Sequence, residues 1–290
     1  MTRILLTGSS GQVGYELLRS LQGLGEIVAV DRARMDLADL DRVREVIRAV
    51  QPTLIVNPAA YTAVDAAESD PALAMRVNAE APAVMAEEAR RIGAAMIHYS
   101  TDYVFDGTKA SPYTEDDPTC PVNVYGRTKL AGEQAIQAAG IDHLILRTSW
   151  VYGARGKNFL LTVLRLARER DELRIVADQH GSPTWCRTIA DSTAHVVAQL
   201  QRNASDRVSW EEISGIYHMT AQGSTSWHGF TEAILAHRSV ERKPVVTPIA
   251  TADFPLPARR PANSVLGCQR FMDTFCSLPQ WDAALRLCQD

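Results

Sequence analysis

The sequence has few cysteines and lacks the spacings that would give them a structural role. Its five cysteines are an odd number, and none belongs to a Cys-x-x-Cys pair. A disulfide framework and a structural zinc site both need paired or clustered thiols, so neither is indicated. The seven histidines are also scattered, without the spacing of metal ligands. We therefore expect reduced thiols, a cytoplasmic protein and no bound metal.

Long hydrophobic runs and an excess of positive charge are also missing. No uncharged apolar segment approaches the ~18 residues of a membrane span. The net charge of −4, without a basic stripe, argues against a nucleic-acid-binding protein. Met1-Thr2-Arg3 leads directly into an expected strand, so no signal peptide is predicted. With 46% apolar and 22% charged residues among 290, the composition is that of a soluble globular protein with a large core.

A glycine-rich loop near the N-terminus predicts a dinucleotide site. A short apolar strand at 4–6 precedes the loop, and a helix-compatible stretch at 15–24 follows it. In such a unit the first glycine permits a tight turn, the second lets the backbone approach a pyrophosphate, and the third allows close packing of helix on strand. A purely structural glycine turn is the alternative, but this context favours a cofactor. The predicted cofactor residues here are Gly8, Ser10, Gly11, Gln12, Val13 and Gly14.

The end of the second expected strand, at 26–31, bears on the choice of cofactor. Asp31 lies where an acid would hydrogen-bond the adenosine ribose, which favours NAD. Arg32 follows at once, and its guanidinium could hold a 2′-phosphate, which favours NADP. We therefore expect NADPH or NADH, and we place Asp31, Arg32, Asp36 and Leu37 among the cofactor-binding residues.

Two segments in the middle of the chain supply a hydroxyl, a phenol and an ammonium. Thr101 emerges from a buried strand, at the carboxyl end where open α/β sheets build their sites. Tyr125 and Lys129 lie four residues apart in an expected helix over 125–139, so they share one face. A nearby cation should lower the pKa of the phenol from about 10 toward the working range. We predict that Tyr125 is a general acid, the alternative being an ordinary surface pair.

Further loops follow the later strands. The strand at 54–57 leads to a small-residue loop in which we assign Ala59, Ala60 and Tyr61 to the cofactor. Trp150 follows the strand at 143–147, where it is either a core residue or a wall of the substrate site. Arg259 and Arg260 lie in a proline-rich loop, and they are either solvated or bind a second phosphate-bearing ligand. The expected helices are at 39–50, 75–92, 159–169, 189–200 and 230–237.

These motifs together resemble a known family. The chain looks like an extended short-chain dehydrogenase/reductase and, within that superfamily, like the dTDP-4-dehydrorhamnose reductases. The resemblance spans nearly the whole chain. The glycine loop and the tyrosine-lysine pair indicate only the superfamily. The segments that point to the closer family are 100–105, 123–126, 128–133, 147–152, 178–184 and 259–261.

The resemblance implies an α/β fold, a Rossmann-type doubly wound parallel sheet with a smaller C-terminal α/β substrate-binding domain. Residues 1–150 and about 188–220 would form the dinucleotide-binding domain, and about 151–187 and 221–290 the substrate-binding domain. The implied reaction is the reduction of the 4-keto group of dTDP-6-deoxy-L-lyxo-4-hexulose to give dTDP-L-rhamnose. Tyr125 would donate the proton, Thr101 would hydrogen-bond the carbonyl oxygen, and Lys129 would hold the nicotinamide ribose. The implied substrate-binding residues are Thr101, Asp102, Trp150, Asn158, Arg259 and Arg260.

Two alternatives share parts of these motifs. One is a non-catalytic binding subunit like the regulatory subunit of methionine adenosyltransferase, and the other is an NAD-dependent nucleotide-sugar epimerase or dehydratase. The intact Thr101, Tyr125 and Lys129 favour catalysis, and the Trp150 loop favours the reductase. Some members of the resembled family dimerise around Mg²⁺ held by glutamates. Here Arg187 stands in the first of those regions, so we expect no Mg²⁺ site and a monomer or weak homodimer.

Overall fold

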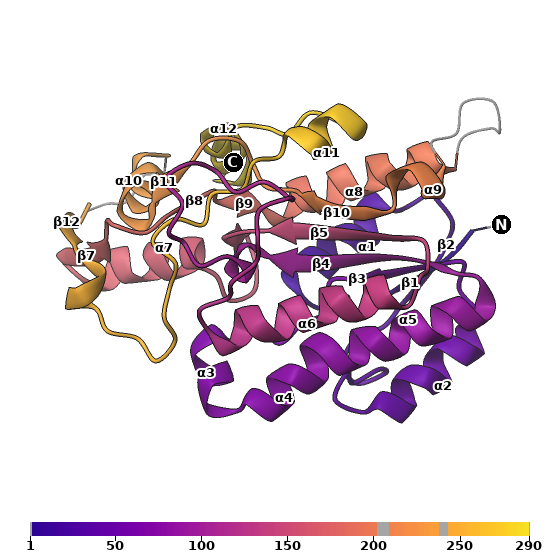
Figure 1. Ribbon diagram of the computed structural model, residues 1–290. Coiled ribbons are helices and arrows are strands. Elements are labelled where there is room, and N and C mark those ends of the chain that lie inside the picture. The colour runs from indigo at the N-terminus through magenta and orange to yellow at the C-terminus, as the bar shows by residue number, and fades with distance from the viewer. Residues whose placement is uncertain (1, 202–208, 238–242, 290) are drawn as a thin grey trace.

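The computed structural model describes residues 2–201, 209–237 and 243–289, and a parallel six-stranded sheet lies at its centre (Figure 1). The strand order is β10-β5-β4-β3-β1-β2. The chain adds β2 on one side of β1 and all later strands, from β3 on, on the other side, as in a doubly wound fold. The predicted fold class is therefore confirmed. The strands are β1 (Arg3–Leu6), β2 (Glu26–Ala29), β3 (Leu54–Asn57), β4 (Ala95–Thr101), β5 (His143–Thr148) and β10 (Gly215–His218).

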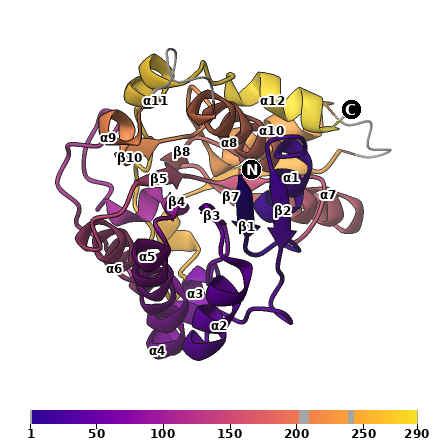
Figure 2. The same ribbon diagram turned by 90° about the vertical axis from the view of Figure 1, so that its right-hand side faces the viewer.

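Alternate side chains of each strand feed two apolar cores, one on each face of the sheet. Ile4 and Leu6 belong to one core, whereas Leu5 belongs to the other, as the two-residue period of a strand requires. The first core is covered by α1 (Gln12–Ser20), α8 (Cys186–Leu200) and α11 (Gln269–Thr274). The second is covered by α2 (Leu40–Val50), α5 (Ala81–Ile92) and α6 (Val124–Ala138), which lie together on the other face (Figure 2).

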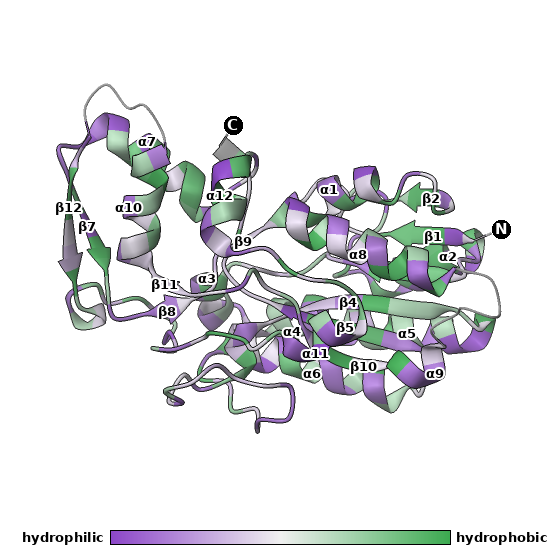
Figure 3. Cartoon of the chain, turned by 90° about the horizontal axis from the view of Figure 1, so that it is seen from above, coloured by the Kyte–Doolittle hydropathy of each residue, from purple (hydrophilic) through white to green (hydrophobic). Residues whose placement is uncertain are grey.

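A smaller lobe extends from the carboxyl-end edge of the sheet and has an aromatic-rich core of its own (Figure 3). Tyr152, Phe230 and Leu285 are fully buried there. Its helices are α7 (Phe159–Glu169), α10 (Trp227–His237) and α12 (Trp281–Gln289), and its parallel strands are β7 (Glu172–Val176) and β12 (Val245–Ile249). Two further strand pairs join β6 (Val151–Tyr152) to β9 (Thr184–Trp185), and β8 (His180–Gly181) to β11 (Thr225–Ser226). The domain boundaries stay a prediction.

The helical region before β4 is less regular than its composition suggested. In place of one helix over 75–92, a π-helical turn, η1 (Arg76–Glu80), separates α4 (Pro71–Met75) from α5, and α3 (Val64–Ser69) precedes them. Such turns are frequent at functional sites, because they redirect a side chain within a helix. Here η1 carries Asn78, which is buried. The remaining short elements are the 3₁₀-helices η2 (Asp102–Val104) and η3 (Thr251–Asp253), and α9 (Trp210–Ile213).

Candidate active site

A cavity of about 600 Å³ lies at the carboxyl ends of the central strands, where the smaller lobe meets the sheet. This is the position at which open α/β sheets bind ligands, because strand order reverses there and the loops diverge. Most of the predicted site residues line it. They are Gly8, Ser10, Gly11, Gln12, Val13, Gly14, Arg32, Asp36, Leu37, Ala59, Ala60, Tyr61, Thr101, Asp102, Tyr125, Lys129 and Trp150.

The glycine loop forms one wall of the cavity and has the shape that a pyrophosphate needs. Gly8 has a φ of 55°, a conformation that side chains disfavour. At Gly14 an added Cβ would collide with the Gly8 carbonyl oxygen, so the close approach of α1 to the loop requires glycine. Gly11 caps α1 without a side-chain hydrogen bond, which leaves the helix N-terminus facing the cavity. These residues therefore fit a dinucleotide phosphate.

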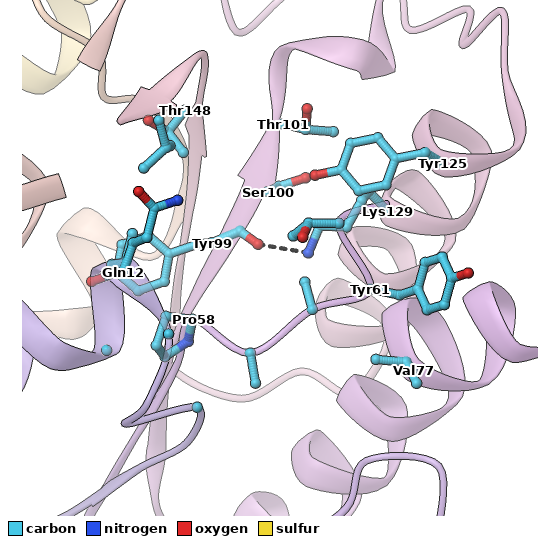
Figure 4. Close-up of a pocket in the computed structure, with 18 of the residues that line it drawn as sticks. Gln12, Pro58, Tyr61, Val77, Tyr99, Ser100, Thr101, Tyr125, Lys129 and Thr148 are labelled. Carbon is cyan, nitrogen blue, oxygen red and sulfur yellow. Dashed lines mark hydrogen bonds between the residues drawn. The ribbon is translucent and has the colours of Figure 1, made fainter. Parts of the chain in front are cut away.

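The expected catalytic residues come from β4 and α6. Thr101 is the last residue of β4, and Asn123 starts α6 by accepting a hydrogen bond from the Gly126 N–H at 2.8 Å. Tyr125 and Lys129 then project from one face of α6 toward β4 (Figure 4). Lys129 is 1% exposed, and its Nζ donates to the Tyr99 carbonyl oxygen at 2.7 Å. The surface-pair alternative is thereby excluded.

The pKa of Tyr125 is shifted in the direction opposite to our expectation. Burial raises the pKa of the Tyr125 phenol to about 12, while the neighbouring Thr101 hydroxyl opposes the rise and the Asp102 charge adds to it. Our prediction that Lys129 lowers the pKa of Tyr125 is wrong for this structure. The physical reason is that desolvation outweighs the other effects, and the Lys129 nitrogen is engaged with the Tyr99 carbonyl. The phenol is therefore kept in the protonated form that a proton donor needs.

Thr101 and Asp102 form a short hydrogen-bonded unit at the end of β4. Thr101 Oγ1 accepts from the Tyr103 N–H at 3.1 Å and donates its single hydrogen to Asp102 Oδ1 at 2.9 Å. Asp102 is 3% exposed. Burial raises the pKa of this carboxyl to about 7, although the hydroxyls of Ser264 and Thr101 oppose the rise. Thr101 can donate to a substrate only when its hydrogen leaves Asp102, which protonation of Asp102 permits.

Asp31 and Asn158 do not line the cavity. Asp31 Oδ1 accepts from the Arg34 N–H at 3.1 Å and so closes the turn after β2. Asn158 caps α7 by accepting from the Leu161 N–H at 3.0 Å, and its amide also donates to Gln12 Oε1 at 2.8 Å. A local turn and a helix cap thus account for two side chains that we assigned to ligands. Asn158 still touches the cavity wall indirectly through Gln12.

The two arginines of the proline-rich loop lie outside the lining as well. Arg259 is exposed, and its carbonyl oxygen accepts from Asn123 Nδ2 at 2.9 Å. The Arg260 guanidinium is largely buried and pairs with Asp65 of α3 at 2.7 Å. Both charges of this pair act on Tyr103, which does line the cavity and meets Tyr125 edge-on with ring centroids 6.0 Å apart. Arg260 therefore lies just behind the rim, close to the reacting end.

An aromatic pair at the opposite wall was only half predicted. The rings of Trp150 and Trp227 are stacked, with centroids 3.4 Å apart and planes at 3°. Trp150 has a φ of 47°, which is uncommon outside glycine, and Trp227 Nε1 donates to Gln179 Oε1 at 3.2 Å. Trp227 escaped the sequence analysis because it begins a helix that we expected to start at Phe230. No local pattern relates it to Trp150, which is far away in the chain.

Asn78 is a supporting residue that the sequence could not identify by itself. Its amide accepts from the Tyr61 N–H at 2.8 Å and donates to the Tyr61 carbonyl at 3.0 Å and to Thr128 Oγ1 at 3.1 Å. It thus fixes the loop after β3 against α6. Other lining residues that we did not assign are Met35, Pro58, Thr62, Val64, Leu73, Val77, Tyr99, Ser100, Tyr103, Thr148, Ser149, Val151, Lys157 and Trp227.

Within residues 2–201, 209–237 and 243–289, no helix combines the length and the apolar character that crossing a bilayer requires. In that same part of the chain, His, Cys, Asp and Glu side chains do not gather in threes that could hold a metal ion. None of the five cysteines, all of which lie within the described residues, is joined in a disulfide. The absence of a metal in function stays a prediction.

Comparison with known proteins gives consistent matches over the whole length. The family model described as RmlD substrate binding domain matches residues 1–290. A dTDP-4-dehydrorhamnose reductase of Burkholderia thailandensis is 53% identical over 99% of this chain and 97% of its own length, and one of Escherichia coli K12 is 42% identical over 98% and 95%. The crystal structure of dTDP-4-dehydrorhamnose reductase from Bacillus anthracis in complex with NADP superposes with a TM-score of 0.90 at 32% identity, covering 100% of this chain and 99% of that one.

Proposed function

The chain belongs to the dTDP-4-dehydrorhamnose reductase family, and on that premise we propose how its own residues carry out the reaction. It is an NADPH-dependent oxidoreductase that reduces the 4-keto group of dTDP-6-deoxy-L-lyxo-4-hexulose to give dTDP-L-rhamnose, the final step of dTDP-rhamnose synthesis. The observation that carries the assignment of roles is the meeting of Thr101, Tyr125 and Lys129 in one cavity beside the glycine loop.

Tyr125 is the proton donor. Bound NADPH supplies the hydride to the carbonyl carbon, and the carbonyl oxygen then becomes an alkoxide, which is more basic than a phenolate. A phenol with a pKa of about 12 keeps its proton at neutral pH and gives it up only to such a base. General acid catalysis of this kind is worth roughly 10²–10⁴-fold in rate.

Thr101 orients the carbonyl oxygen by donating a hydrogen bond to it, and the protonation state of Asp102 controls whether the Thr101 hydrogen is available. The Thr101 hydrogen is donated to Asp102 in the present structure, so the ketone must compete for it. A protonated Asp102 donates to Thr101 instead, and the Thr101 hydrogen then turns to the carbonyl oxygen. With a pKa of about 7, Asp102 is in the right range to make this change near neutral pH.

Gly8, Gly11 and Gly14 would hold the pyrophosphate of the cofactor at the N-terminus of α1. Residues Arg32, Asp36 and Leu37 would surround the adenosine end, and Lys129 would hold the nicotinamide ribose. Arg32 favours the 2′-phosphate of NADPH, while Asp31 is occupied by the Arg34 amide. NADH would therefore be used less well than NADPH.

The sugar nucleotide occupies the side of the cavity that faces the smaller lobe. Asp102 and Trp150 would contact the hexose, and Arg259 and Arg260 would bind the diphosphate from the rim. Arg260 would exchange part of its contact with Asp65 for the phosphate. In the proposed two-domain division, residues 1–150 and about 188–220 bind the cofactor, and about 151–187 and 221–290 bind the sugar nucleotide. Asn158 would act on this site indirectly, because its amide holds the side chain of Gln12, which lines the cavity.

We also propose that the protein acts in the cytoplasm, where NADPH is available, and that it is a monomer or weak homodimer. The side chain of Arg187 pairs with Asp191 at 3.6 Å, one turn further along α8. A guanidinium at that position repels a divalent cation, which supports assembly without Mg²⁺.

The direct test is the consumption of NADPH and of NADH, followed spectrophotometrically, with the dTDP-4-keto-6-deoxy sugar as substrate. We expect turnover that requires the sugar and is faster with NADPH, with dTDP-rhamnose as the product. Purification with tightly bound oxidised NAD, without net consumption of NADPH, would indicate an epimerase or dehydratase. Tight association with another enzyme and no turnover would indicate a binding subunit.

A further inference from the structure

The segment 153–158 joins β6 to α7 and lies against the first turn of α1, next to the glycine loop. The Asn158 amide pins it there, because Nδ2 donates to Gln12 Oε1 at 2.8 Å and to the Gly153 carbonyl oxygen at 2.9 Å. Gly156 has a φ of 80°, and a Cβ added to it would lie 3.1 Å from Gln12 Cγ. Gln12 itself lines the cavity (Figure 4). The segment is therefore built to approach α1 closely at the edge of the cofactor site.

A tyrosine of α1 holds the same segment by its ring. The Arg155 guanidinium carbon lies 3.3 Å from the centroid of the Tyr15 ring, and the Arg19 guanidinium carbon lies 3.3 Å from the same centroid. Two guanidiniums cannot share one face of a ring at that distance, so they cover opposite faces. Arg19 Nη1 also donates to the Tyr15 carbonyl oxygen at 2.7 Å. A cation–π contact thus fixes Arg155 on α1.

This arrangement gathers positive charge at the start of α1. Arg155 and Lys157 are exposed side chains of the segment, and Arg19 lies one turn beyond Tyr15. Glu16, the one acid of α1, forms no ion pair with Arg19 or Arg155. Lys157 likewise pairs with no carboxylate in the part of the chain that the structure describes. Charges of one sign that lack partners, beside the N-terminus of a helix, favour an anion.

Lys157 is the member of this group that reaches the ligand space, since it lines the cavity. The other cations among the described lining residues are Arg32 and Lys129. Arg32 pairs with Asp36 at the end proposed for adenosine, and Lys129 is buried at the end proposed for nicotinamide. The glycine loop at 8–14 contains no cation, so it meets a pyrophosphate with backbone N–H groups alone. Lys157 is the cation that remains to balance the charge of that pyrophosphate.

We propose that the segment 153–158 is a basic clasp on the cofactor. Lys157 is a binding residue that supplies positive charge to the pyrophosphate. Tyr15 is a positioning residue, which holds the segment through Arg155 so that Lys157 lies at the cavity. The inference rests on the proposed reductase function and deepens it, because it assigns a cation to the dinucleotide that this function requires.

The clasp is distinct from the arginines that we assign to the sugar nucleotide. Arg260 pairs with Asp65 of α3, and α3 packs on α6, which covers the face of the sheet opposite to α1. The two phosphate-bearing ligands are thus met by cations on different sides of the cavity. Loss of the Lys157 charge should therefore weaken the binding of the cofactor and spare that of the sugar nucleotide.

The test measures the Kd of NADPH and of NADH for the free full-length protein, from nicotinamide fluorescence without any sugar. Lys157→Met keeps the apolar stem and removes the charge, so it should raise both Kd values by about threefold to tenfold, the loss of one exposed charge-assisted contact. Lys157→Arg keeps the charge and should stay within about twofold of wild type. The ratio between Lys157→Met and wild type should fall toward one at about 0.5 M salt, where exposed charges are screened.

Three outcomes of the Kd measurement would overturn the role of Lys157. One is an unchanged Kd for both cofactors in Lys157→Met. Another is a ratio to wild type that persists at high salt, because lost packing is not screened. The third is a rise for NADPH alone, which would place Lys157 at the 2′-phosphate. Arg32→Gln is the matched contrast, since it should weaken NADPH and spare NADH.

Variants of Tyr15 test the positioning role without changing any charge. Tyr15→Leu removes the ring on which Arg155 lies and should raise both Kd values by about twofold to fivefold, whereas Tyr15→Phe keeps the ring and should match wild type. In the Lys157→Met background, Tyr15→Leu should have no further effect, because it acts through Lys157. Additive effects in the double variant, or equal losses in Tyr15→Leu and Tyr15→Phe, would refute the positioning role.

Binding and turnover together separate the clasp from the function beneath it. A protein that binds NADPH in a Lys157-dependent way but does not reduce the dTDP-4-keto sugar refutes the function and leaves the clasp. An active wild-type enzyme whose Lys157→Met variant binds both cofactors normally refutes the clasp alone. In the active enzyme, Lys157→Met should leave the KM for the dTDP-sugar within about twofold of wild type, since distant sites act independently. A loss for the sugar as large as that for NADPH would contradict the assignment of Lys157 to the cofactor.

Discussion

The two sides of the cavity are built in different ways. On the cofactor side, Lys129 is fully buried and Tyr125 is half-buried between α6 and the sheet, and their neighbours are ends of adjacent parallel strands. On the sugar side, Trp150, Trp227 and Arg260 come from loops and helix starts that are far apart in the chain. Packed strand ends fix geometry, whereas loops from a second lobe permit adjustment around a ligand.

This difference suggests a division of labour. Groups that move protons need fixed partners and a dry environment, and the sheet side supplies both. Groups that bind the sugar nucleotide must give way when it arrives, as the exchange of the Arg260–Asp65 pair for a phosphate would require. Changes on the sheet side should therefore lower kcat, and changes on the loop side should raise KM.

The largest expected effect belongs to the proton donor. Tyr125→Phe removes one hydroxyl and little volume, so kcat should fall by roughly 10²–10⁴-fold while NADPH binding stays nearly the same. Single-turnover kinetics with the dTDP-4-keto sugar would measure it. Tyr103→Phe is the matched control, because it removes a neighbouring half-buried phenol that meets Tyr125 edge-on. Near-normal turnover in Tyr125→Phe would show that another group supplies the proton.

A smaller effect is expected at the rim. Arg260→Ala should raise the KM for the dTDP-sugar about tenfold or more, since a charge-assisted contact contributes ~1.5–3 kcal/mol, and it should leave the KM for NADPH unchanged. Asp65→Asn releases Arg260 from its partner and should not raise the KM for the sugar. Equal weakening of both ligands in Arg260→Ala would indicate general destabilisation instead.

The cofactor preference should respond more modestly. Arg32 lines the cavity but is highly exposed and already pairs with Asp36 at 3.1 Å, so its contribution is screened by water. Arg32→Gln should raise the KM for NADPH several-fold and leave that for NADH within about twofold. Parallel kinetics with the two cofactors test this. An equal rise for both cofactors would place the 2′-phosphate elsewhere.

Asp102 should affect stability in a pH-dependent way. Its pKa is raised from 3.8 to about 7, so the folded state binds a proton that the unfolded state releases between these values. The free energy of unfolding should therefore fall as pH rises from about 4 to 7, by at most ~1.4 kcal/mol per pH unit. Asp102→Asn removes this contribution and should gain stability relative to wild type over the same range. Denaturant titrations at pH 4.5 and 7.5 would detect it, and parallel curves for both proteins would contradict it.

The smallest expected effect is that of chelation. Neither side of the cavity uses a metal in the proposed chemistry, so EDTA should change neither activity nor the sedimentation of the protein relative to buffer with Mg²⁺. A dimer that dissociates in EDTA would overturn the assembly part of the proposal.

The sequence predicted many of the residues that line the cofactor side of the cavity, because these residues lie next to the strands that position them. Gly8 and Ala59 follow strands that their apolar pattern reveals, and Thr101 ends another such strand. Parallel strands bring their carboxyl ends to one edge of the sheet. Lys129 could be placed with Tyr125 from helical spacing alone. The sense of the Tyr125 pKa shift could not be predicted, because it depends on how deeply α6 packs against the sheet.

The sugar side was predicted only in part, since its contacts depend on chain segments far apart in the sequence. Nothing near Arg260 indicates its ion pair with Asp65, and nothing near Trp150 indicates the stacked Trp227. Asp31 shows a further limit, because the position that suits a ribose contact also suits a turn, and here the turn occupies the carboxylate.

The most direct test of the whole account follows the hydride itself. The enzyme is incubated with the dTDP-4-keto sugar and NADPH that carries deuterium at both positions of nicotinamide C4, and the product is examined by NMR. We predict dTDP-rhamnose with one deuterium at sugar C4 and an equimolar amount of oxidised cofactor, and no such transfer in Tyr125→Phe over the same time. Product without deuterium at C4, or labelled product formed equally fast by Tyr125→Phe, would contradict it.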